Sequence, residues 1–117
     1  MQKIKPVLPS LREKKRYLAF EVISKARLKS YDTLEKSIFD SLTQLIGEMG
    51  MAQAGIIMLK DKYNADKQRG LLRVSTKSLN QVRQALTFVQ NIENQPVIVH
   101  TVGVSGILKK AVSNYMK

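Results

Sequence analysis

The residue types that catalysis or metal binding requires are few in this sequence of 117 residues, and they lie far apart. His100 is the only histidine, and no second ligand lies at a spacing that suits a metal ion. There is no cysteine, which excludes disulfide bonds, cysteine-based zinc sites and thiol catalysis. The nine acidic residues are scattered, and no acid–base pair or activated nucleophile is apparent. The sequence therefore predicts neither a catalytic residue nor a metal site in the protein itself.

One short segment, Gly103-Val-Ser-Gly106, could present backbone N–H groups to a phosphate, because it leads from an expected strand into an expected helix. It lacks the full spacing of a nucleotide-binding loop. We interpret this segment as a simple strand-to-helix turn.

Positive charge is the strongest chemical feature of the chain. The sequence has 20 lysines and arginines against 9 acidic residues, a formal net charge of +11. Such a surface attracts phosphate polyanions, so nucleic acid is the first candidate partner and an anionic membrane is the second. The alternative is that the charge serves only to keep the protein in solution. No apolar run approaches the roughly 18 residues that cross a bilayer, and the N-terminus lacks a signal-peptide core. We expect a cytoplasmic protein that does not enter a membrane.

The basic residues are grouped in three segments of the sequence. Each group alone is typical of a solvated face, but with the net charge the groups indicate one shared patch. Arg73 lies within an apolar strand, so its guanidinium needs a partner, either an acid such as Glu21 or an outside anion. The candidate RNA-binding residues are Lys14, Lys15, Arg16, Arg73, Lys109 and Lys110.

The periodicity of apolar residues predicts the elements that position these groups. Strands are expected over 15–26, 54–60, 70–76 and 97–104. A helix is expected to begin with Asp32 as N-cap and to end near Gly47 and Gly50. Its apolar stripe is Leu34, Ile38, Leu42, Leu45 and Met49. A second helix opens at Ser78, and a third, over 106–116, is capped by Ser105.

This order predicts an α+β protein with a ferredoxin-like (RRM-like) β-α-β-β-α-β fold, a four-stranded antiparallel sheet and an additional C-terminal helix. Residues 1–14 form a basic N-terminal arm, and residues 15–117 form the single domain. Both faces of the sheet are apolar, so the last helix and a protein partner, or a second copy of the chain, should cover the second face. The candidate surface for that partner consists of Ile57, Leu59, Ile98 and Val102.

Base stacking of the kind used by RNA-recognition motifs is disfavoured. The third strand, Gly70-Leu-Leu-Arg-Val-Ser75, contains no aromatic residue. Tyr17 and Phe20 of the first strand are interpreted as core or partner-facing residues. Contacts with RNA should therefore go mainly to phosphates and to shape.

Three segments resemble the ribonuclease P protein component 2 family, the small ferredoxin-like subunit of archaeal ribonuclease P, which has a eukaryotic relative. They are Leu-Pro-Ser-Leu-Arg-Glu-Lys-Lys-Arg-Tyr at 8–17, Gly-Leu-Leu-Arg-Val at 70–74 and Val-Ser-Gly-Ile-Leu-Lys-Lys-Ala at 104–111. Each motif is weak alone, and the specificity comes from their order, the length and the charge. Ile107 stands where family members often carry threonine.

The resemblance implies a subunit of the ribonucleoprotein endoribonuclease that removes the 5′ leader of precursor tRNA. The RNA subunit would carry the active site and use Mg²⁺, the protein would bind no cofactor, and precursor tRNA would be an indirect partner. The resemblance also implies pairing with ribonuclease P protein component 3, in a heterotetramer of two such pairs. A ferredoxin-like assembly module without RNA function, or a small-molecule-binding regulatory domain, is the alternative.

Overall fold

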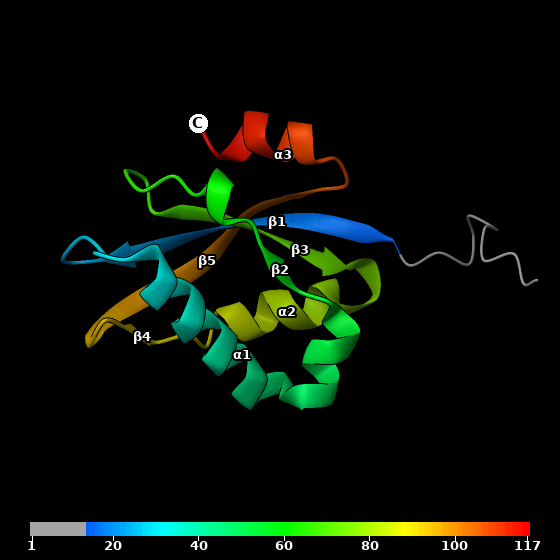
Figure 1. The fold of residues 1–117 in the computed structure, drawn as a ribbon, viewed down its shortest axis with the longest axis horizontal. Coiled ribbons are helices and arrows are strands. Elements are labelled where there is room, and N and C mark those ends of the chain that lie inside the picture. Colours follow the sequence, from blue (N-terminus) through cyan, green and yellow to red (C-terminus); the bar gives the residue numbers. More distant parts are fainter. Residues whose placement is uncertain (1–13) are drawn as a thin grey trace, which may run out of the picture.

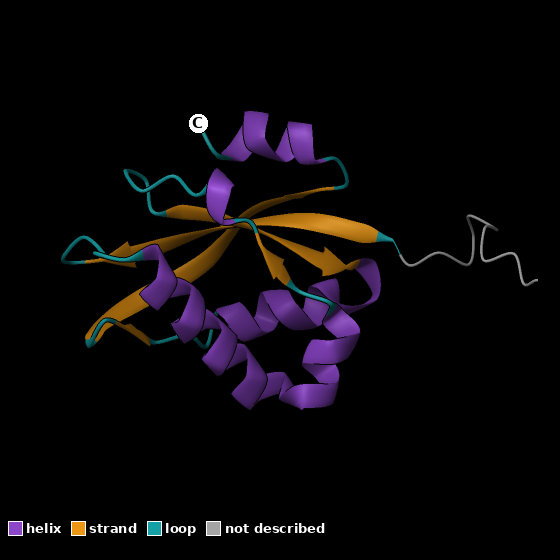
Figure 2. Cartoon of the chain, in the orientation of Figure 1, coloured by secondary structure: helices purple, strands orange, loops and turns teal. Residues whose placement is uncertain are grey.

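The computed structural model describes residues 14–117, and the rest of the basic arm, residues 1–13, lies outside the described part of the chain. One antiparallel sheet is covered by helices on both sides (Figures 1 and 2). The strands are β1 (Lys15–Ser24), β2 (Ile57–Met58), β3 (Arg69–Ser75), β4 (Asn91–Ile92) and β5 (Gln95–Ser105). The α-helices are α1 (Tyr31–Ala54), α2 (Leu79–Leu86) and α3 (Leu108–Tyr115), and two short 3₁₀ helices are η2 (Lys60–Lys62) and η3 (Thr76–Ser78).

The sheet has the order β2-β3-β1-β5-β4, so β1 is central and pairs antiparallel with β3 and β5. Without β4 this is the ferredoxin-like arrangement that the sequence predicts. The extra strand β4 is a correction to the four-stranded prediction. Glu93 and Asn94 adopt positive φ angles of 55° and 60°, which turns the chain tightly enough for Ile92 to pair with Gln95.

The second strand is much shorter than the 54–60 segment that the sequence predicts. Helix α1 continues to Ala54, and η2 begins at Lys60, so only Ile57 and Met58 pair with β3. Within this segment only Ala54 is buried and Ile57 is exposed, and periodicity alone cannot separate a strand from the end of a helix.

The larger core lies between the sheet and helices α1 and α2. Every second residue of β1, namely Leu18, Phe20 and Val22, points into it. The first three residues of the expected stripe of α1 pack against them and are fully buried: Leu34, Ile38 and Leu42. Burial of this apolar face, rather than helix propensity, holds α1 in place.

The expected apolar stripe of α1 is buried only as far as Leu42, and the helix is kinked at Gly47. Gly47 has φ 77° and ψ 169°, a backbone conformation that glycine adopts without steric cost. Leu45, before the break, is 49% exposed, and Met49, after it, is 79% exposed. Gly47 therefore kinks the helix instead of ending it, and the helix stops at Gly55, a left-handed C-cap with φ 56°.

The helix ends also differ from the sequence prediction. The N-cap of α1 is Ser30, whose hydroxyl accepts a 3.4 Å hydrogen bond from the Thr33 N–H, and Asp32 lies inside the first turn. The N-cap position of α3 is Ile107, because Ser105 still belongs to β5. The Ser105 hydroxyl nevertheless accepts a 3.1 Å hydrogen bond from the Ile107 N–H and so shapes the turn.

Helix α3 covers the second face of the sheet. Ala111 and Met116 pack on Ala19 and Leu71 in a smaller core. Tyr115 lies so close to Gly103 that a Cβ there would be 2.3 Å from the tyrosine ring. The prediction that the last helix covers this face is confirmed. In residues 14–117 no helix combines the length and the apolar character that crossing a membrane requires.

Candidate nucleic-acid interface

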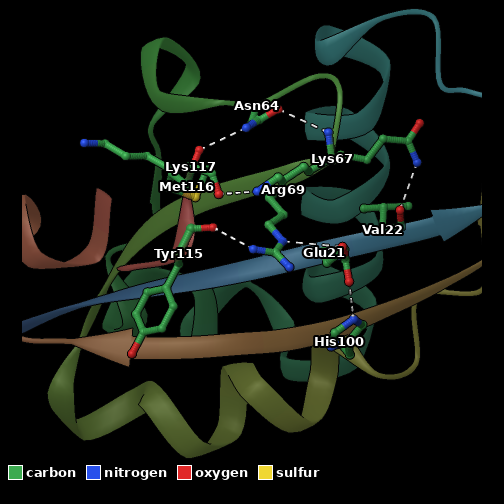
Figure 3. A network of polar contacts seen from close by, with 10 residues as sticks. Glu21, Val22, Asn64, Lys67, Arg69, His100, Tyr115, Met116 and Lys117 are labelled. Carbon is green, nitrogen blue, oxygen red and sulfur yellow. Dashed lines mark hydrogen bonds and ion pairs between the residues drawn. The ribbon is translucent and has the colours of Figure 1, made fainter. Parts of the chain in front are cut away.

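A polar network beside α3 fixes the orientation of that helix (Figure 3). Glu21 accepts hydrogen bonds from Arg69 Nε at 3.4 Å and from His100 Nε2 at 2.7 Å. Arg69 also donates to the Tyr115 carbonyl at 3.1 Å, and Asn64 donates to the Met116 carbonyl at 2.9 Å. The C-terminal end of α3 is thereby tied to β3 and to the loop before it.

Glu21 is expected to make the folded chain sensitive to acid. The hydrogen bond from His100, and after it the hydrogen bond and the charge of Arg69, lower the pKa of Glu21 below its ordinary 4.5, against burial, which raises it. A depressed folded-state pKa stabilises the fold above pH 4.5, and the stabilisation is lost as pH falls through the folded-state value. We expect Glu21→Gln to be less stable than the parent near neutral pH and to lose less melting temperature on acidification.

Thermal melts between about pH 6 and about pH 3 test this expectation. Glu48→Gln is the matched control, because the Glu48 side chain is exposed and forms no hydrogen bond or ion pair within residues 14–117. An identical acid-induced loss in Glu21→Gln and in the parent chain would show that the network does not contribute.

The structure corrects the suggested pairing of Arg73 with Glu21. In the register of β1 and β3, Arg73 lies opposite Tyr17, whereas Arg69 lies opposite Glu21. Arg73 Nε is buried and has no hydrogen-bond partner in the described part of the chain. Glu21 is therefore not the partner of Arg73, and a contact of Arg73 with an anion from outside the chain stays a prediction.

The topology places the candidate basic residues at one end of the sheet, which we call the basic end: Lys14, Lys15, Arg16, Arg73, Lys109 and Lys110. The start of β1, the end of β3 and the connection from β5 to α3 meet there, on the right of Figure 1. Tyr17 pairs with Arg73 on one side and with Ser105 on the other. A Cβ on Gly106 would lie 3.5 Å from Arg16 Nη1, so this guanidinium reaches the turn before α3.

The remaining candidate residues also lie at the basic end. Lys14 accepts a backbone hydrogen bond of 2.8 Å from Thr76, just beyond β3. Lys109 and Lys110 are exposed in the first turn of α3. That these residues contact RNA stays a prediction.

The ion pairs of the described part of the chain lie mostly away from the basic end. Ion pairs within residues 14–117 join Arg27 to Asp66, Lys36 to Asp40, Lys60 to Asp32, Lys62 to Asp61, and Arg69 and His100 to Glu21. Among these described pairs none involves Lys14, Arg16, Arg73, Lys109 or Lys110. A cluster of cations attracts a polyanion such as RNA.

The candidate partner residues do not form one surface. Ile57 and Ile98 are exposed, at 44% and 63%. Leu59 and Val102 are half-buried against α3 in the smaller core. Their role at a protein interface stays a prediction.

Arg69 and Asn64, which position α3, were not singled out by the sequence analysis. Arg69 directly precedes the apolar run of β3, and an arginine at that place indicates an ion pair across strands. Its partner depends on the register, which the sequence does not reveal. In the part of the chain that the structure describes, no three histidine, aspartate or glutamate side chains are grouped closely enough to hold a metal ion.

The fold and the charge distribution define a small basic protein of the ferredoxin-like α+β class, with cations gathered at one end of its sheet. Residues 16–116 match the model of the Rpp14/Pop5 family. The chain belongs to this family.

Individual relatives agree with the family match. The chain is 35% identical over 109 residues to ribonuclease P protein component 2 of Thermococcus kodakarensis, covering 93% of this chain and 88% of that protein. It is 32% identical over 114 residues to ribonuclease P protein component 2 of Methanosarcina mazei, covering 97% and 94%. A chain in the cryo-EM structure of yeast ribonuclease MRP has a similar fold, with a TM-score of 0.64, 12% identity and coverage of 81% of this chain and 76% of that one.

Proposed function

We propose that this chain is a protein subunit of ribonuclease P, the ribonucleoprotein that removes the 5′ leader of precursor tRNA. The family membership and the extent of the match to proteins named ribonuclease P protein component 2 support the assignment. The single structural observation that carries it is the basic end, where three segments distant in sequence bring cations together.

The chemical role of such a subunit is electrostatic. Folded RNA brings phosphates close together, and their repulsion opposes the active fold. Cations at the basic end would replace the counterions around those phosphates, so the RNA would need less Mg²⁺ to fold. The RNA would carry the active site and its Mg²⁺, and the protein would contribute no catalytic residue.

A second protein subunit is part of the proposal. Ribonuclease P protein component 3 would bind next to this chain, in the cytoplasm, in a heterotetramer of two such pairs. Exposed apolar side chains such as Ile57 and Ile98 support a protein contact, because they gain stability when a partner buries them.

Reconstitution of tRNA-leader cleavage tests the proposal. The catalytic RNA is assayed with component 3, with and without this chain, over a series of Mg²⁺ concentrations. We expect the chain to lower the Mg²⁺ concentration at half-maximal cleavage and to show no cleavage by itself. An unchanged Mg²⁺ requirement would contradict the RNA-stabilising role, and cleavage by the repurified chain after RNase treatment would contradict the non-catalytic one.

A further inference from the structure

The outer edge of β5 is open along most of its length. In the sheet order, β5 lies between β1 and β4, and β4 pairs only with Gln95 and Pro96. The opposite edge of the sheet differs, because β2 has only two residues. Within residues 14–117, β5 therefore supplies the long unpaired strand edge.

The register identifies the backbone groups that face this open edge. The Val97 N–H donates outward to the Gln90 carbonyl at 2.9 Å. The backbone groups of a strand point alternately to its two sides, so those of Val99 and Thr101 also face outward. The register shifts by one residue after Thr101, and Val104 resumes the outward direction. These N–H and C=O groups have no neighbouring strand in the described chain.

The edge carries no charged side chain of the kind that commonly prevents strand pairing. Residues 94–108 contain no aspartate, glutamate, lysine or arginine, although 25% of the whole chain is charged. Natural edge strands are commonly protected by charges, and a lysine here would discourage an added strand. An uncharged open edge is what a docking strand requires.

A polar groove runs beside the edge. It has a volume of about 390 Å³ and lies between β5 and the exposed side of α2. Its lining is Asn80, Arg83, Gln84, Thr87 and Thr101. On the other side of the sheet the same strand presents Ile98, which is 63% exposed. A strand added here would have polar side chains toward α2 and apolar side chains toward Ile98.

We propose that the β5 edge is a docking site for an extended, acidic segment of a protein partner, which adds to the sheet as a further strand. Main-chain hydrogen bonds would hold the segment in place, and alternate side chains would give specificity. Charge favours an acidic segment over a second copy of this chain, because each copy carries a net charge of +11 and would place Arg83 against the same groove. This site does not depend on the proposed RNA function, because none of its groove residues belongs to the basic end.

Amide hydrogen exchange on the full chain tests the site directly. The probe is a synthetic peptide of alternating glutamate and valine, and the control peptide has the same composition with the glutamates and valines in two blocks. We expect the alternating peptide alone to slow exchange at Val99, Thr101 and Val104, whose N–H groups face outward. The amides of Ile98 and Gly103, which face β1, should already exchange slowly without it.

A pair of variants adds an affinity measurement. Thr101→Pro removes one outward N–H and should weaken peptide binding about tenfold, whereas Thr101→Val should leave it nearly unchanged. If Thr101→Pro does not fold, the exchange experiment on the unaltered chain decides alone. The proposal would be overturned if the peptide protects none of the three amides. It would also be overturned if the three amides are protected by self-association at high protein concentration, or by added single-stranded RNA instead of the peptide.

Discussion

Replacing both Lys109 and Lys110 by alanine is expected to weaken RNA binding for every RNA sequence alike. Phosphate contacts are independent of sequence, and each one releases about 0.7 to 0.9 of a counterion. The slope of log K against log salt should therefore become shallower by about one unit for each lost contact, or roughly two units for both. Both lysines are exposed in the first turn of α3, so their removal should leave the fold intact.

The control for this prediction removes the same charge elsewhere. Lys25 and Lys29 are exposed in the loop after β1, at the opposite end of that strand from Lys14 and Arg16. We expect Lys25→Ala with Lys29→Ala to change the slope much less. Salt titrations of the reconstituted RNA complex, with a thermal melt of each variant, measure the difference. Equal slopes for the two double variants would mean that net charge, and not the basic end, determines binding.

The second large effect concerns two glycines that touch aromatic rings. A Cβ on Gly70 would lie 2.4 Å from the ring of Phe20, and one on Gly103 would lie 2.3 Å from the ring of Tyr115. Phe20 is fully buried in the larger core, so its ring has no space to move into. Overpacking a core costs about 1 to 3 kcal/mol, and we expect Gly70→Ala to reach the upper end of that range.

Gly103→Ala should cost less despite the equally short distance. Tyr115 is only half-buried, and it lies on α3 at the surface of the molecule, so the ring and the helix can shift outward. We expect a loss of about 1 kcal/mol, partly offset by the reduced freedom of the unfolded chain. Denaturant unfolding gives both values, and the NMR signals of Tyr115 report the displacement of α3. Equal costs for the two variants would show that α3 is packed as rigidly as the core.

Much of the fold could be predicted because it depends on local periodicity. Leu18, Phe20 and Val22 alternate along β1 and enter one core, as a period of two requires. Leu34, Ile38 and Leu42 repeat at helical spacing and are buried together. The segments that carry the basic residues could be identified in the same way. Their meeting at one end of the sheet follows from the ferredoxin-like order, in which β1 lies between β3 and β5.

The sequence by itself determined the types of the main helices and strands, most of their apolar faces and the excess of positive charge, because each depends on neighbouring residues. Only the tertiary structure decided the partner of Glu21, since a register places Arg69 opposite it and Arg73 opposite Tyr17. The kink at Gly47 also required the structure, because glycine permits a positive φ angle but does not demand one. The open edge of β5 could not be predicted from the sequence either. Whether a strand edge is covered depends on chain segments far away in the sequence, and their pairing is settled by the packing of the whole fold.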